Sequence, residues 1–327
     1  MLGSVSRWAL AAAMLLVPGF ASAQDYPTRP VTVIVPFAAG GPSDTIARLT
    51  AEYMGRALGQ QFVIENVGGA GGTIGAARVA RAAPDGYTLL VTHIALPASA
   101  TLYKNLPYDT ANAFEALGFI NMGPYALIAY KNYPPNTVAE LLATLRKDGD
   151  KVRMGHAGVG SASHLCTLLL GSAAGFKPTD VPYRGTGPAM QDLVAGNIDV
   201  MCDQTTNSLP QIEGKAVKAY AVTSIKRVPQ LPDLPTLDGS GVKGFDMTVW
   251  HGLYAPKGTP KAIIDKLNAA LQKTVNEPNV IARFEQLSNY PFPPEQRSAE
   301  VHAARFKADV AKWREVITAA GVSGAGY

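Results

Sequence analysis

Charged residues and cysteines are both scarce in this sequence. Asp, Glu, Lys and Arg make up 17% of the 327 residues, the formal net charge is +4, and there is no basic arm or run of lysines. This charge pattern argues against a nucleic-acid partner. The two cysteines are Cys166 and Cys202. In an exported protein such a pair can oxidise to a disulfide, but two buried free thiols fit the sequence equally well.

Long hydrophobic runs are also absent. A membrane span needs about 20 consecutive apolar residues, whereas the N-terminal run from Trp8 to Val17 has ten. Arg7 precedes this run, and Ala21-Ser22-Ala23 follows it. The three features together predict a secretory signal peptide over residues 1–23, cleaved after Ala23, and therefore an exported protein. No cysteine follows the run, which argues against a lipid anchor.

Motifs that carry catalysis are missing as well. There is no Gly-Lys-Ser or Gly-Lys-Thr phosphate loop, and Ile74 stands where a dinucleotide-binding fingerprint needs a small residue. Ser161 lacks the flanking glycines of a nucleophile elbow. The five histidines, none in a zinc-protease spacing, are His93, His156, His164, His251 and His302. A metal site from His93, His156 and His164 has no diagnostic spacing behind it. The sequence therefore predicts no enzyme, no cofactor and no metal.

Four segments share one pattern, in which an apolar run is followed by a glycine-rich turn and then by a helical period. The runs begin at Val31, Phe62, Val152 and Val181. Alternating strand and helix signals are typical of parallel βαβ units and predict an α/β fold. Ser43 or Asp44 suits the N-cap of the first helix. Ligands bind at the carboxyl ends of parallel strands and anions bind at helix starts, so the four turns favour an anion site.

The chain is long enough to divide into two domains. Breaks rich in Pro, Asn, Gly and Asp lie at 132–136 and 228–244. We predict a discontinuous first lobe of residues 24–124 and 251–327, a second lobe of residues 125–250, and a ligand cleft between them. Two crossings between the lobes make hinge closure around a ligand plausible. We expect a monomer.

Ten short motifs, in order along the chain, identify a family. They are Tyr26-Pro27, Val35–Asp44, Glu65-Asn66, Pro84–Tyr87, Leu106–Asp109, Gly158–His164, Val181–Gly185, Gly196–Asp203, Leu234–Thr236 and Gly252–Pro256. Together they resemble the substrate-binding proteins of tripartite tricarboxylate transporters, also called the Bug family. The resemblance implies a two-lobe periplasmic binding protein, or Venus flytrap, with a mostly parallel sheet flanked by helices in each lobe. It also implies a carboxylate ligand and, as partner, the membrane permease subunits of a tripartite transporter.

The resemblance further implies which residues meet the ligand. Backbone amides of both lobes would hold its near carboxylate, in part through ordered waters. They lie around Ala39, Gly40 and Ser43 in the first lobe and around Gly160, Ser161 and Ser163 in the second. The far end of the ligand would meet His93, Arg184, Asp203, Thr205 and Asn207. Arg184 offers a planar fork for a second carboxylate. The alternatives are a surface arginine in a turn and a purely structural His93.

We therefore predict a non-enzymatic solute-binding protein for a small organic carboxylate, in particular a dicarboxylate. An aromatic diacid such as terephthalate fits Arg184 and His93, and adipate-like and citrate-like ligands stay open. One alternative function is an extracytoplasmic sensor module for the same ligand. Another is a periplasmic serine hydrolase that uses Ser161 or Ser163 with His164, although no motif places an orienting acid.

Overall fold

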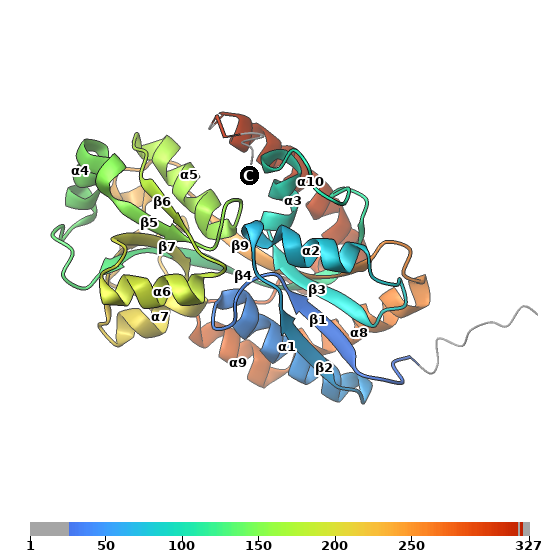
Figure 1. The fold of residues 1–327 in the computed structure, drawn as a ribbon. Helices are drawn as coiled ribbons and strands as arrows, with labels where there is room; N and C mark the ends of the chain where they lie inside the picture. The colour runs from blue at the N-terminus through green and yellow to red at the C-terminus, as the bar shows by residue number, and fades with distance from the viewer. Residues whose placement is uncertain (1–25, 320, 323–327) are drawn as a thin grey trace, which may run out of the picture.

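The structure is a computed structural model that describes residues 26–319 and 321–322. The predicted signal peptide and its cleavage site lie outside the described residues. The chain forms two α/β lobes side by side, which confirms the expected fold class (Figure 1). In the part that the structure describes, no helix combines the length and the apolar character that crossing a membrane requires.

The first lobe is built around the parallel strands β1 (Val31–Val35), β2 (Phe62–Asn66) and β3 (Thr88–His93). Side chains along a strand alternate between the two faces of the sheet. Val31, Val33 and Val35 accordingly pack in the apolar layer of α1 (Pro42–Leu58) and α8 (Lys261–Val275). Ile34 packs in the opposite layer, which contains α2 (Thr73–Ala80), α3 (Ala95–Leu102) and α10 (Ala299–Ala319). Helix α9 (Pro278–Gln286) follows α8.

The second lobe repeats this plan with the parallel strands β5 (Arg153–His156), β6 (Thr179–Pro182) and β7 (Val200–Gln204), and with β8 (Val217–Val222). Its helices are α4 (Val138–Asp148), α5 (Ala162–Ala174), α6 (Thr186–Ala195) and α7 (Thr205–Glu213). Short 3₁₀ turns lie at Ala70–Gly72, Gly149–Lys151, Asp238–Ser240 and Pro294–Gln296.

Two strands lie where the chain passes between the lobes, and the first of them joins the two sheets. These are β4 (Phe114–Tyr130) and β9 (Thr248–Pro256), which pair with each other and with their other neighbours in the antiparallel sense. The resulting strand order is β2-β1-β3-β9-β4-β7-β5-β6, with β8 on β4. Strand β4 pairs with β9 up to Pro124 and with β7 and β8 from Tyr125 onward. Strand β4 therefore belongs to the sheets of both lobes.

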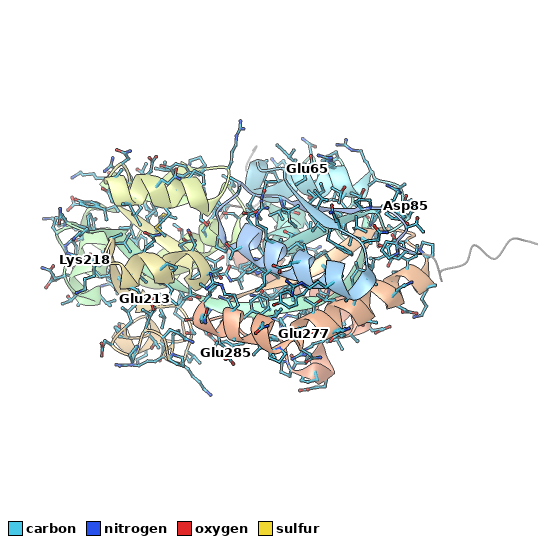
Figure 2. The ribbon with its side chains drawn as sticks, turned by 90° about the horizontal axis from the view of Figure 1, so that it is seen from below. Glu65, Asp85, Glu213, Lys218, Glu277 and Glu285 are labelled. Atoms are coloured by element: carbon cyan, nitrogen blue, oxygen red, sulfur yellow. A yellow bond between two sulfur atoms is a disulfide. The ribbon has the colours of Figure 1, made fainter. Side chains whose placement is uncertain are left out.

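A disulfide joins Cys166 in α5 to Cys202 in β7, with their Cα atoms 6.2 Å apart. Both residues are fully buried, so the bridge lies inside the second lobe. Charged side chains such as Glu65, Glu213 and Lys218 lie instead at the periphery of the two lobes (Figure 2). The interior of each lobe is mostly apolar, although buried polar side chains such as Thr110, Arg297 and Asp309 also occur.

Candidate ligand-binding cleft

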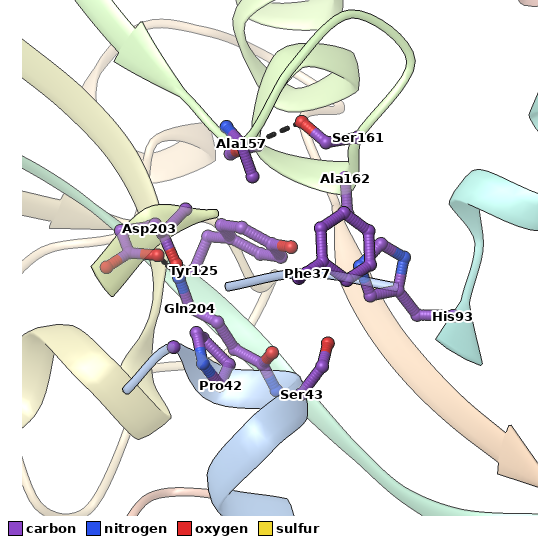
Figure 3. Close-up of a pocket in the computed structure, with 13 residues that line it drawn as sticks. Phe37, Pro42, Ser43, His93, Tyr125, Ala157, Ser161, Ala162, Asp203 and Gln204 are labelled. Carbon is purple, nitrogen blue, oxygen red and sulfur yellow. Dashed lines mark hydrogen bonds between the residues drawn. The ribbon is translucent and has the colours of Figure 1, made fainter. Parts of the chain in front are cut away.

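A small cavity lies between the lobes, at the first turns of α1 and α5 (Figure 3). Its volume is about 20 Å³, which is room for one or two waters. The cleft is therefore closed, and it must open to admit an organic acid. The cavity is lined by Phe37, Gly41, Pro42, Ser43, His93, Tyr125, Ala157, Ser161, Ala162, Ser163, Thr186, Asp203 and Gln204.

The glycine turns form the surfaces on which the lobes close. The amide of Ala38 donates to the carbonyl of Arg184 across the cleft at 2.9 Å, and the Tyr103 hydroxyl donates to the Val159 carbonyl at 2.7 Å. A Cβ on Gly187 would lie 2.8 Å from the Ala39 carbonyl oxygen of the other lobe. Backbone thus meets backbone with no room for a side chain. The sequence prediction assigned these turns to ligand binding and did not foresee this role.

The start of α1 differs from the expected arrangement. The predicted N-cap at Ser43 or Asp44 is wrong, because the helix begins at Pro42 and Gly41 is the N-cap. Proline is favoured at the first helical position. The Ser43 hydroxyl hydrogen-bonds His251 Nε2 at 3.1 Å. The Asp44 carboxylate accepts the amide of Gly40 at 3.0 Å, so that predicted ligand donor already has an acceptor.

Ser161 is the N-cap of α5, and the whole turn before this helix is tied together. The Ser161 hydroxyl accepts the His164 amide at 3.3 Å and lies 3.1 Å from the hydroxyl of Ser163. Ser163 in turn accepts the Ala157 amide at 2.9 Å. The predicted donor Gly160 gives its amide to His164 Nδ1 at 3.1 Å. Neither Gly160 nor Gly40 nor Ala39 lines the cavity.

Free donors remain in the first turns of the two helices. First-turn amides of a helix have no partner within the helix. Among the described residues, the amides of Ser43, Ala162 and Ser163 have no hydrogen-bond acceptor, and all three residues line the cavity. Two helix starts, one from each lobe, therefore present free N–H groups and the positive ends of their dipoles to one space.

His93 lies at the side of the cavity, where its ring stacks on Phe37 with 4.8 Å between centroids. Its Nδ1 accepts the Ala95 amide at 3.1 Å, so the neutral ring carries its proton on Nε2. Burial lowers the pKa of His93 to about 3. His93 is therefore a neutral hydrogen-bond donor at physiological pH and not a cation.

The far end of the cavity is formed by Asp203 at the end of β7. Its Oδ1 accepts the Gln204 amide at 2.9 Å, and its Oδ2 accepts from Asn207 Nδ2. Burial raises the pKa of Asp203 to about 7, against the hydrogen bonds from Asn207, Thr186 and Gln204. Asn207 thus supports Asp203 from behind. Thr205 donates to the carbonyl of Pro124 at 3.3 Å, and neither it nor Asn207 lines the cavity.

Arg184 is exposed and lies outside the cavity lining. Its carbonyl takes part in lobe closure, and its predicted contact with a second carboxylate stays a prediction. Tyr125, Thr186 and Gln204 line the cavity but were not predicted. Thr186 follows the fourth glycine turn at a helix start, which is a signal that the sequence contained. Tyr125 lies within the long strand β4, where nothing in the sequence marks it.

The histidines of the second lobe do not suit a metal ion. His156, His164 and Asp180 place one ligand atom each within 4.8 Å of one another. However, His156 Nδ1 accepts the Gly158 amide at 3.2 Å and His164 Nδ1 accepts the Gly160 amide. A neutral imidazole has one acceptor nitrogen. Each Nε2 therefore carries a proton, so neither ring has a lone pair to offer a metal ion.

The contacts of the hydroxyls bear on the hydrolase alternative. In the described part of the chain, the Ser161 and Ser163 hydroxyls bond each other and backbone amides, and neither bonds a histidine ring. Ser43 does contact His251, but Nδ1 of His251 has no partner among the described residues. Burial lowers the pKa of His251 well below its usual value. A serine nucleophile needs a competent base oriented by an acid, and this arrangement supplies neither.

Several proteins of known structure are similar to this chain in sequence and in fold over most of its length. Residues 46–322 match the family described as tripartite tricarboxylate transporter family receptor. The periplasmic binding protein BugD is 48% identical, with a TM-score of 0.88, over 91% of this chain and 99% of BugD. MatC from Rhodopseudomonas palustris, solved with bound malate, is 42% identical with a TM-score of 0.86, over 89% of this chain and 100% of MatC. R. palustris Rpa4515, solved with adipate, is 32% identical with a TM-score of 0.86, over 91% of this chain and 99% of Rpa4515.

The family match covers more than half of the chain, and the solved relatives share its fold over 89–91% of its length. The chain therefore belongs to the tripartite tricarboxylate transporter receptor family and is a Bug-type solute-binding protein.

Proposed function

We propose that this protein captures a small organic dicarboxylate in the periplasm and delivers it to the membrane permease of a tripartite transporter, without covalent chemistry. The observation that carries the proposal is the convergence of the free amides of Ser43, Ala162 and Ser163 on one cavity. Hydrogen bonds from such amides to a carboxylate contribute about 1.5–3 kcal/mol each. The relatives solved with malate and with adipate support a ligand of this class.

Because the donors belong to opposite lobes, the ligand would complete the closure. In an open form it would first meet the amides of one helix start. Rotation about the crossing strands β4 and β9 would then bring up the second helix start. The cavity of the closed structure is too small for a dicarboxylate, so the side chains that line it would move aside while the glycine turns of the two lobes stay in contact. A permease could then recognise the loaded protein by its closed shape.

Thermal melts against mono-, di- and tricarboxylates test this function. A ligand at 100 times its dissociation constant adds about 2.7 kcal/mol of stability, and for a protein of this size each kcal/mol raises Tm by roughly 2–4 °C. We expect the largest shift with one or a few dicarboxylates. A neutral diol or diamide of matched chain length serves as the control. Equal shifts for the diacid and its neutral control, or no shift with any acid, would contradict the proposal.

A further inference from the structure

The two ends of the cavity differ in electrostatic character. One end presents the amides of the helix starts, and the other presents Asp203. No Lys or Arg is among the described residues that line the cavity, and Asp203 is its one carboxyl group. His93, the nearest candidate for a positive charge, is neutral for the reason given above. A ligand that fills this cavity therefore meets donors at one end and an acid at the other.

The surroundings of Asp203 leave its carboxylate incompletely satisfied. It is fully buried, and its contacts are the Gln204 amide, Asn207 Nδ2 and the side chain of Thr186. A carboxylate has about four acceptor positions, so one is left for another donor. The groups that face it from the packed elements are Tyr125 on β4, Thr186 on α6 and Asn207 on α7, and none carries a positive charge.

We propose that Asp203 determines specificity by accepting a hydrogen bond from the ligand, so that the ligand is a carboxylic acid with a hydroxyl or an ammonium group. The inference rests on the proposed function and narrows its substrate class. A ligand carboxylate placed beside Asp203 would leave two buried like charges together, which is costly. A hydroxyl or an ammonium group would instead fill the open acceptor position. Malate in MatC carries such a hydroxyl. Adipate in Rpa4515 does not, so the fold alone does not decide the choice.

Three acids with the same four-carbon skeleton separate the possibilities. Succinate, malate and aspartate differ only in the hydrogen, hydroxyl or ammonium at one carbon. In calorimetric titrations at pH 8, either malate or aspartate should bind at least about tenfold more tightly than succinate. Which of the two does so depends on whether the cleft accepts a hydroxyl or an ammonium group. Asp203→Ala should reduce this preference to less than about threefold, whereas Asp233→Ala, an exposed loop position of the same lobe, should leave it unchanged. A preference that survives Asp203→Ala would overturn the proposal, as would wild-type binding of succinate as tight as that of both other acids.

Proton linkage gives a second test that does not depend on whether Asp203→Ala folds. A donor on the ligand stabilises the ionised form of Asp203, so binding near pH 7 should release protons. A carboxylate in its place would require a protonated Asp203, so binding would take protons up. Titrations in two buffers of different ionisation enthalpy read the sign, and Asp203→Asn should abolish the release. Proton uptake would refute the assignment. If none of the three acids, nor any other acid, binds the wild-type protein, the proposed function itself fails.

Discussion

Replacement of Gly187 by alanine tests whether tight closure of the lobes controls ligand affinity. Gly187 lies in the first turn of α6, and its φ is outside the left-handed region, so alanine is allowed there, although Pro188 makes the helical conformation less favourable for a preceding alanine. Its Cβ would stand 2.8 Å from the Ala39 carbonyl oxygen and 3.1 Å from the Gly40 carbonyl carbon, both in the opposite lobe. The clash therefore exists only when the cleft is closed.

The size of the effect follows from these distances. An ordinary contact begins at 3.4 Å, so the lobes must stay apart by about 0.6 Å at this point. Overpacking of this kind costs about 1–3 kcal/mol, which corresponds to roughly 5- to 150-fold weaker ligand binding. In the open form, the better helix propensity of alanine is opposed by Pro188, which disfavours the helical conformation of a preceding alanine. We therefore expect weaker binding with a nearly unchanged Tm of the ligand-free protein.

Calorimetric titration with the best acid of the melt panel measures the affinity, and scanning calorimetry measures Tm. Gly214→Ala is the matched control. It lies in the same lobe at the end of α7, and its Cβ would meet only carbonyls of that helix. A dissociation constant for Gly187→Ala within twofold of wild type would show that the loaded form never closes this far. A Tm several degrees lower would show that the glycine serves the second lobe and not the closure.

Three further predictions concern the donors, the disulfide and pH. Ala162→Pro removes one free amide at the first position of α5, where proline is tolerated and where Ser161 already has the extended conformation that precedes proline; titration should show about tenfold or greater loss of carboxylate affinity, with Lys261→Pro at the start of α8 as the unaffected control. Reduction of Cys166–Cys202, which closes a separation of 36 residues, should cost about 3–4 kcal/mol of unfolding free energy in denaturant titrations, and no change in the midpoint would contradict a stabilising bridge. Burial lowers the pKa of His93, His156 and His302 to about 3, so the unfolded chain binds more protons below about pH 6.5, and Tm should fall as pH drops from 6.5 towards 4; a flat profile would contradict neutral buried histidines. The raised pKa of Asp203, about 7, has the opposite sign, so Asp203→Asn should raise Tm at pH 8 and leave it unchanged at pH 4.

The sequence predicts the fold well because local patterns determine it. The apolar run at Val31, the glycine turn after it and the helical period that follows each depend on neighbouring residues, and they form as expected. The pairing of Cys166 with Cys202 could not be decided, because a bridge depends on the distance between two elements that are separated in the chain.

The site was predicted less completely, for a physical reason. Helix starts were recognised, but which of their amides stay free depends on side chains that bond back to them. Asp44 occupies the amide of Gly40, and His164 occupies that of Gly160, which moves the free donors to Ser43, Ala162 and Ser163. Tyr125 enters the site only because β4 passes between the lobes. Arg184 is a different case. Its carbonyl accepts a hydrogen bond from the other lobe, whereas Arg184 is not among the residues that line the cavity.

The disulfide has a consequence for the length of ligand that the second lobe can bind. Cys166 follows the free amides of α5 by a few residues, and Cys202 immediately precedes Asp203. The covalent bond thus restrains the distance between the α5 amides, which would bind one end of an acid, and Asp203, which would contact the other end. Both groups belong to the second lobe, so we expect an acid of unsuitable length to be rejected before the first lobe closes over it.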